Sequence, residues 1–152
     1  MRIGVISDTH GLIRDEAVAA LQGSELILHA GDVGSNDVIA ALAEIAPVKA
    51  VRGNVDRCEW ADVLPEMQMI SAAGQSFHLL HNIAELDIDP TRERCDAVIF
   101  GHSHKPLIEC RSGVLFLNPG SAGPRRFRLP DCLARIDVGD NGMVPEIVDL
   151  AV

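Results

Sequence analysis

Residues 2–31 of the chain, RIGVISDTHGLIRDEAVAALQGSELILHAG, contain the pattern that decides the fold. Two apolar runs, RIGVIS (2–7) and ELILHAG (25–31), stand on either side of RDEAVAALQ (14–22), which has a helical pattern. A second helical pattern and a third apolar run follow, at NDVIAALAEI (36–45) and VKAVRG (48–53). Because apolar runs that alternate with helices are typical of βαβ units, the first half predicts a parallel sheet.

The second half of the chain has a different pattern, in which short apolar runs are joined by turn residues such as AAGQ, RSG and GDNG. The pattern predicts strands joined largely by hairpins, at EMQMISA (66–72), QSFHLLH (75–81), DAVIF (96–100), PLIECR (106–111), VLFLN (114–118), CLARIDV (132–138) and MVPEIVDL (143–150). The polar segment 84–95 predicts a loop or one short helix. The expected fold is α/β (α+β by segregated halves), with two packed mixed β-sheets flanked by helices in one domain, residues 1–152.

The composition of the chain excludes several classes of protein. The 152 residues carry a formal net charge of −9 and only 3% are aromatic, which argues against binding to nucleic acid. No stretch approaches the roughly 18 apolar residues of a membrane span. The four cysteines form no C-x-x-C pair, so neither a zinc ribbon nor a thioredoxin motif is expected. These features favour a cytoplasmic protein with reduced thiols.

Polar side chains follow the apolar runs at the points where the predicted strands end. All of them are of metal-ligand type: Asp8 and His10, Asp32, Asn54, His81, and His102 with His104 in GHSH (101–104). In open α/β sheets, sites are assembled outside the carboxyl ends of the strands. We therefore expect these side chains to meet at one edge.

Each of these motifs taken singly has an ordinary structural explanation. Asp8 could cap the following loop, and the Gly-Asp and Gly-Asn pairs ending at Asp32 and Asn54 are common turn sequences,. His81 could be a packed strand histidine, and the GHSH histidines could be solvated turn residues. The ordered series D-x-H, G-D, G-N-x-D, H and G-H-x-H, each at the end of a strand, is much more specific than its parts.

This series resembles the calcineurin-like metallophosphoesterase superfamily, and the short chain is similar to its small bacterial and archaeal YfcE-type phosphodiesterases. NPGS (118–121) also resembles a late motif of these small members. The resemblance implies a four-layer α/β/β/α metallophosphoesterase sandwich. It also implies a binuclear metal-dependent phosphodiesterase that hydrolyses small-molecule phosphoesters by attack of a metal-bridging hydroxide.

The resemblance further implies a ligand set. Asp32 would bridge two metals, with Asp8, His10 and His104 on the first and with Asn54, His81 and His102 on the second. Asp32, Asn54 and His102 would be the catalytic residues, and Asp56 would orient a ligand or its loop. Such a set of oxygen and nitrogen ligands suits Mn²⁺, the first choice, with Fe²⁺, Zn²⁺ or Ni²⁺ as alternatives.

Two positions depart from the family pattern. Val55 stands where many members have a histidine that acts on the leaving oxygen, and Asn82 replaces part of an H-G-H motif. Three arginines follow NPGS and could hold a substrate phosphate, although a solvated turn is the favoured interpretation: Arg125, Arg126 and Arg128,. His29 and His78 fall within strand runs and are expected to be packed in the core.

Three alternative functions are also compatible with parts of the pattern. The first is a phosphomonoesterase or nucleotidase of the same fold. The second is a non-catalytic interaction scaffold, since the resemblance extends to the phosphoesterase-like subunit of the retromer coat. The third is a single-metal binding protein, which would leave two ligand sets around one aspartate unexplained. A homodimer is the expected oligomer.

Overall fold

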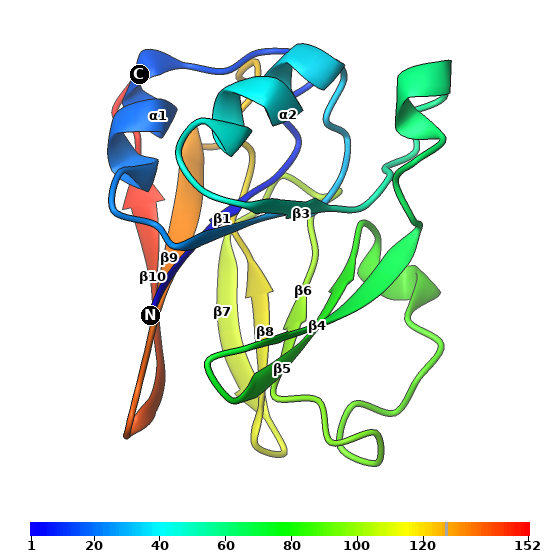
Figure 1. The fold of residues 1–152 in the computed structure, drawn as a ribbon, viewed down its shortest axis with the longest axis vertical. Coiled ribbons are helices and arrows are strands. Elements are labelled where there is room, and N and C mark those ends of the chain that lie inside the picture. Colours follow the sequence, from blue (N-terminus) through cyan, green and yellow to red (C-terminus); the bar gives the residue numbers. More distant parts are fainter. Residues whose placement is uncertain (127) are drawn as a thin grey trace.

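The computed structural model describes residues 1–126 and 128–152, and within these residues the chain forms two five-stranded sheets packed face to face (Figure 1). The first sheet has the order β10-β9-β1-β2-β3, with β1 Arg2–Ile6, β2 Leu26–His29, β3 Val48–Ala50, β9 Cys132–Gly139 and β10 Gly142–Asp149. The second has the order β4-β5-β6-β8-β7, with β4 Met67–Ala72, β5 Gln75–Leu80, β6 Ala97–Ile99, β7 Leu107–Arg111 and β8 Val114–Asn118. The fold of two mixed sheets flanked by helices is confirmed.

The predicted βαβ alternation forms the parallel part of the first sheet. Strand β1 pairs in parallel with β2, and β2 pairs in parallel with β3. The connections are helix α1 (Asp15–Leu21) and helix α2 (Asn36–Ala43). Ser35 caps α2, since its hydroxyl accepts a hydrogen bond from the Asp37 N–H at 3.1 Å,.

The sheets do not follow the two halves of the chain. The C-terminal hairpin of β9 and β10 returns to the first sheet, where β9 lies antiparallel to β1. Figure 1 shows this hairpin at the edge of the sheet beside α1. The second sheet is also mixed, since β6 lies parallel to both β5 and β8.

Three apolar layers hold the fold together. One lies between the sheets and contains Val5, Leu28, Phe77 and Ile99, among others. A second lies between the first sheet and the two α-helices, which are seen above it in Figure 1. A third covers the outer face of the second sheet, where the packing partners come from segment 81–95 and its single 3₁₀ turn η2 (Ile83–Glu85). The fourth layer is therefore a short turn and a loop, as the polar sequence of this segment allows.

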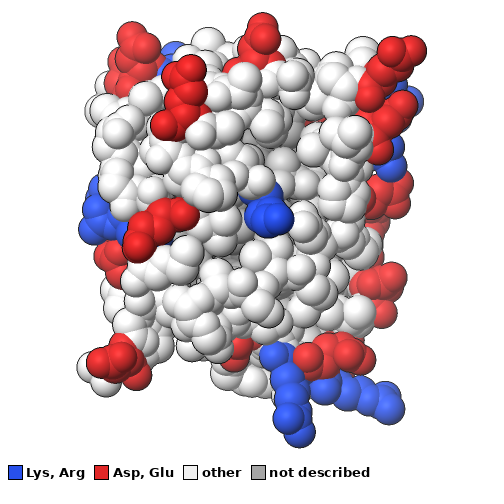
Figure 2. Space-filling model, in the orientation of Figure 1, with Lys and Arg blue, Asp and Glu red and all other residues white. Residues whose placement is uncertain are grey.

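The charged side chains are scattered on the face drawn in Figure 2. Acidic groups lie mainly around its margins, and the described Lys and Arg residues form no continuous track across it. This distribution agrees with the acidic composition and argues against a nucleic-acid path on that face.

Among the helices that the structure describes, none has the length and apolar character needed to cross a membrane.

Candidate metal centre

The seven predicted side chains lie in five loops, each at the carboxyl end of a strand. Asp8 and His10 follow β1, Asp32 follows β2, and Asn54 follows β3. From the second sheet, His81 follows β5, and the GHSH loop follows β6. Because β1, β2 and β3 are parallel, as are β5 and β6, their carboxyl ends bring these loops to one edge of the sandwich,.

The backbone at this edge is held in an uncommon conformation. Asp8, His10, Asp32, His102 and His104 all have positive φ angles, between 48° and 74°. Non-glycine residues rarely adopt this left-handed conformation, and each costs on the order of 1 kcal/mol or more. Because five such residues lie in one cluster, interactions elsewhere in the fold must offset their conformational cost and hold these side chains toward the centre.

Two glycines allow the loops to approach each other closely. A Cβ on Gly53 would lie 2.1 Å from Asp32 Oδ1, and a Cβ on Gly101 would lie 2.1 Å from Ser7 Oγ. A larger residue at either position would therefore displace Asp32 or Asp8 from the centre.

A first group of side chains surrounds the Asp8 carboxylate. Its Oδ1 lies 3.3 Å from His104 Nε2 and 3.9 Å from His10 Nε2. Its Oδ2 is already held by the Ser7 hydroxyl at 2.7 Å and by the His102 N–H at 3.1 Å. Asp8, His10 and His104 can thus converge on one ion.

A second group surrounds His81. Its Nε2 lies 3.0 Å from Asn54 Oδ1 and 3.3 Å from Asp32 Oδ2. The same nitrogen lies 3.3 Å from His102 Nδ1 and 3.9 Å from Asp8 Oδ1. Asp32 Oδ2 is also 3.7 Å from His10 Nε2, so this carboxylate faces both groups. By these distances Asp8 and Asp32 both stand between the two sets of imidazoles.

The donor set fits a divalent cation. Asp8 is fully buried, and its Oδ1 has no hydrogen-bond partner. The His81 Nδ1–H donates to the Ala30 carbonyl at 2.7 Å, so Nε2 is the ring nitrogen that faces the oxygen atoms of Asn54 and Asp32 and can bind an ion,. A positive charge among these buried oxygen atoms, on a protonated imidazole or on a metal ion, offsets the cost of burying them.

The charges of the centre are coupled. Burial alone would raise the pKa of Asp32, but the hydrogen bond and charge of His81 outweigh burial and lower this pKa to about 2. Burial would lower the pKa of His81, but the carboxylates of Asp32 and Asp8 raise it. For His10, burial is the larger effect and lowers the pKa. Asp32 is therefore ionised and available as a ligand at neutral pH.

Asp56 holds the loops that carry Asp32 and Asn54. Its carboxylate is 1% exposed and accepts three backbone hydrogen bonds, from Val33 (3.0 Å), Gly34 (2.9 Å) and Gly53 (2.9 Å). None of these bonds involves a side-chain atom of a predicted metal ligand. Asp56 links the loop after β2 to the loop after β3, which agrees with the expectation that it orients a ligand or its loop.

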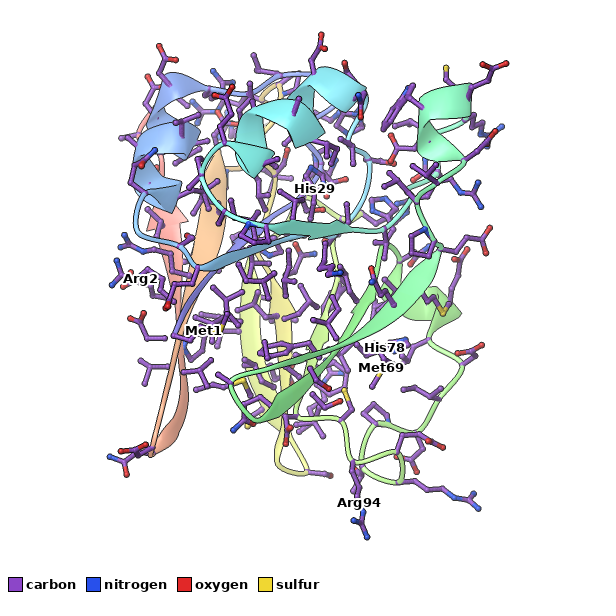
Figure 3. All side chains as sticks on the ribbon, viewed as in Figure 1. Met1, Arg2, His29, Met69, His78 and Arg94 are labelled. Carbon is purple, nitrogen blue, oxygen red and sulfur yellow. The ribbon has the colours of Figure 1, made fainter. Side chains whose placement is uncertain are left out.

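His29 is buried, as predicted, but it also connects two loops of the centre. Its side chain points toward the helices, on the same face of the sheet as Ile27 (Figure 3). The Gly31 N–H donates to His29 Nδ1 at 3.1 Å, so His29 Nε2 carries the hydrogen and donates to Thr9 Oγ1 at 3.0 Å. The Thr9 hydroxyl in turn donates to the Val33 carbonyl at 2.8 Å. Neutral His29 satisfies every one of these bonds.

This arrangement predicts a pH dependence of stability. Complete burial lowers the pKa of His29 from 6.5 to about 4. Between these values the unfolded chain binds the extra proton, so we expect the free energy of unfolding to fall by about 3 kcal/mol as pH drops from about 6.5 to about 4. Urea unfolding of the metal-free protein at several pH values measures this slope. His29→Gln should remove the contribution of His29 to the pH dependence of the free energy of unfolding. Equal slopes in the variant and the wild-type protein would show that His29 is not the group responsible.

Two residues of NPGS support the centre, and sequence reasoning alone gave no physical reason for them. Asn118 Nδ2 donates to the Gly101 carbonyl at 3.0 Å and to Ser103 Oγ at 3.2 Å, so it holds the GHSH loop. The Ser121 hydroxyl donates to the Asp8 carbonyl at 3.1 Å. The motif therefore ties the loop after β6 to the loop after β1.

The remaining histidine and the arginines lie outside the ligand set. His78 is packed as predicted, with Nδ1 2.9 Å from Met69 Sδ, and both are labelled in Figure 3. Arg125, Arg126 and Arg128 are exposed. Arg126 nevertheless affects His10. Burial has the largest effect on the pKa of His10 and lowers it, and the positive charge of Arg126 also lowers this pKa.

A cavity of about 370 Å³ opens beside the second group. It is lined by Gly53, Asn54, Glu66, His81, Asn82, Glu85 and His102. Asn54 and His102 are exposed, whereas His81 is only 6% exposed. A small molecule can therefore reach the exposed ligands while the carboxylates stay buried.

Comparison with known proteins identifies the family of the chain. Residues 1–141 match the model of the calcineurin-like phosphoesterase superfamily domain. A protein of Methanothermobacter thermautotrophicus named as a probable metallophosphoesterase is 35% identical, over 90% of this chain and 87% of its own length. The phosphodiesterase YfcE of Escherichia coli is 25% identical, over 97% of each chain.

A solved structure shows the same fold. Vps29 of Entamoeba histolytica, crystallised with zinc, superimposes with a TM-score of 0.77 at 22% identity, and the match covers 99% of both chains. The similarity extends over the whole sandwich. The family match and the curated relatives lead to the conclusion that the chain belongs to the calcineurin-like phosphoesterase superfamily, with YfcE-type phosphodiesterases among its relatives, and is a phosphoesterase hydrolase.

Proposed function

We propose that the protein is a binuclear metal-dependent phosphodiesterase that acts on a small-molecule phosphoester in the cytoplasm. The observation that supports this most strongly is the convergence of three imidazoles, those of His10, His81 and His104, on a partnerless buried oxygen, Asp8 Oδ1. Asp8, His10 and His104 would hold one ion, and Asn54, His81 and His102 the other, with Asp32 between them. Mn²⁺ is the first candidate, and Fe²⁺, Zn²⁺ and Ni²⁺ suit the same ligands.

A pair of bound ions would supply Lewis-acid activation of water and of the phosphoryl oxygens. The residues of the chain supply position and charge. Asn54 and His102 line the 370 Å³ cavity, where their side chains would orient the phosphodiester,. Asp32, held by the Val55 N–H at 3.1 Å, keeps its carboxylate directed at the centre.

Activity and metal content together test the proposal. Protein prepared without metal should bind two equivalents of Mn²⁺ and then hydrolyse bis(4-nitrophenyl) phosphate faster than 4-nitrophenyl phosphate. The monoester as the better substrate would favour a phosphomonoesterase instead. Two bound ions with no turnover of either ester would contradict the proposed activity.

The interaction scaffold is the second candidate, because the fold is shared with Vps29. All seven predicted ligand residues are retained and brought together here, which favours the enzyme. If a metal titration of this protein detected no binding at micromolar concentrations, the result would favour the scaffold.

The Val55 departure predicts a preference among leaving groups. The Val55 side chain is 46% exposed beside Asn54, and it cannot protonate a leaving oxygen. General acid catalysis typically contributes about 10²–10⁴-fold, so alkyl esters should react slower than nitrophenyl esters by at least about 10²-fold. Val55→His should raise the rate on alkyl esters more than the rate on nitrophenyl esters. Comparable wild-type rates on both classes would contradict this prediction.

A further inference from the structure

A second and larger cavity lies on another side of the GHSH loop. Its volume is about 920 Å³, and its described lining residues are Ser103, Lys105, Arg128 and Leu129. Among these residues there is no carboxylate, and neither Lys105 nor Arg128 forms a salt bridge with another described residue. Two positive charges without partners therefore border this cavity.

Ser103 adds a hydrogen-bond donor to the cavity. Its Oγ accepts hydrogen bonds from Asn118 Nδ2 and from the Lys105 N–H, both at 3.2 Å. Its hydroxyl hydrogen has no acceptor among the described residues. The side chains of Ser103, Lys105 and Arg128 can thus each donate a hydrogen bond to a ligand, which is the pattern that recognises an anion with several acceptor oxygens,.

The cavity and the metal centre share one loop. Ser103 and Lys105 stand on either side of His104, so their Cα atoms lie about 3.8 Å from that of His104. His104 itself is only 6% exposed and turns inward to Asp8. The same loop therefore contributes His104 to the centre and Ser103 and Lys105 to the cavity.

The two cavities differ in the charged residues that border them. Glu66 and Glu85 border the 370 Å³ cavity, and Glu66 is paired with Arg52 at 3.3 Å. The described lining of the 920 Å³ cavity has two basic residues and no carboxylate. An anionic arm of an ester would therefore be attracted to the larger cavity.

We propose that the cavity bordered by Ser103, Lys105 and Arg128 is a subsite for a second, non-scissile phosphate group of the substrate. The inference rests on the proposed phosphodiesterase function and deepens it, because it names the substrate class as phosphodiesters that carry a further phosphate. The other arm of the ester then lies toward the cavity bordered by Glu66 and Glu85.

Two matched esters test the subsite. Thymidine 5′-(4-nitrophenyl phosphate) and its 3′-phosphorylated form differ by one phosphate group and release the same nitrophenolate. The Mn²⁺-loaded wild-type protein should hydrolyse the 3′-phosphorylated ester with a kcat/KM at least about tenfold higher. Replacing both basic residues, Lys105→Ala and Arg128→Ala, should lower this ratio by about tenfold or more.

The control variant removes two positive charges, as the test variant does, but at residues far from the cavity. Arg92 and Arg94 are exposed, and Figure 3 shows Arg94 at the opposite end of the molecule from His29. Changing both to alanine should leave the ratio between the two esters unaltered. An equal drop in this control would mean that net charge alone sets the preference, and the subsite would be refuted.

Calorimetric titration separates the subsite from the activity. Thymidine 3′,5′-bisphosphate should bind the Mn²⁺-loaded protein about tenfold more tightly than thymidine 5′-monophosphate, and the double alanine variant should lose this difference. The binding difference without any turnover would support the subsite while the proposed phosphodiesterase function fails. Turnover of both esters at equal rates, with equal binding, would overturn the subsite and leave the phosphodiesterase function intact.

Discussion

Replacing Asp32 with asparagine is expected to lower kcat/KM for bis(4-nitrophenyl) phosphate by about 10³-fold or more. A bridging carboxylate would contribute to both ions, and each 1.36 kcal/mol of lost stabilisation reduces the rate tenfold. Asparagine keeps an oxygen for the hydrogen bond from Val55 but removes the negative charge that faces His10 and His81. Steady-state kinetics and metal analysis of the same preparation measure the two effects.

The fold of the Asp32→Asn variant should be retained, because the residue lies in a loop outside the three apolar layers. Asp140→Asn, in the exposed turn between β9 and β10, makes the same charge change and should leave both activity and metal content unaltered. An Asp32→Asn protein that holds two ions and retains most of its activity would contradict the bridging assignment.

Replacing Asp56 with alanine is expected to lower the free energy of unfolding by about 3–5 kcal/mol. The change leaves the N–H groups of Val33, Gly34 and Gly53 without their acceptor at a site that is almost fully buried. Because the same bonds hold the loops of Asp32 and Asn54, metal affinity should also fall, by about 10–100-fold. Urea unfolding and Mn²⁺ titration measure the two losses.

The Asp56→Asn variant serves as the matched comparison, since it keeps the shape and one acceptor oxygen. It should lose less stability than the alanine variant, while both should lose metal affinity. A loss below about 1 kcal/mol in Asp56→Ala would show that water replaces the carboxylate and that Asp56 does not hold these loops.

The strand ends and the ligand residue types could be predicted because both depend on local patterns. The apolar period places the strands, and the residues that follow them are visible in the sequence, as with Asp8, Asp32 and the GHSH loop. Parallel pairing then brings the carboxyl ends together without further information. The burial of His29 and His78 could be predicted in the same way, from their position within apolar runs.

Features that depend on contacts between distant segments could not be predicted. The sequence does not say that β9 and β10 join the first sheet, because their apolar pattern suits either sheet. The bonds from Asn118 to Gly101 and Ser103 of the GHSH loop span 17 and 15 residues and join the end of β8 to the loop after β6. The cavity bordered by Lys105 and Arg128 likewise joins two loops that are far apart in the chain.

The left-handed backbone of the ligand residues was also beyond sequence reasoning. Histidine and aspartate adopt positive φ more often than most non-glycine residues, but still at only a small fraction of their positions, so their residue types do not predict the five angles observed,. The glycines that precede Asp32, Asn54 and His102 were the one local signal of crowding at this edge. Their close approaches to neighbouring loops explain them.

Anomalous diffraction from crystals soaked in Mn²⁺ locates the bound ions and so decides whether the centre is binuclear. We expect two anomalous peaks, one against Asp8, His10 and His104 and the other against Asn54, His81 and His102, with the Asp32 carboxylate between them. A single peak, or none at this edge of the sandwich under conditions in which the enzyme is active, would refute the binuclear centre.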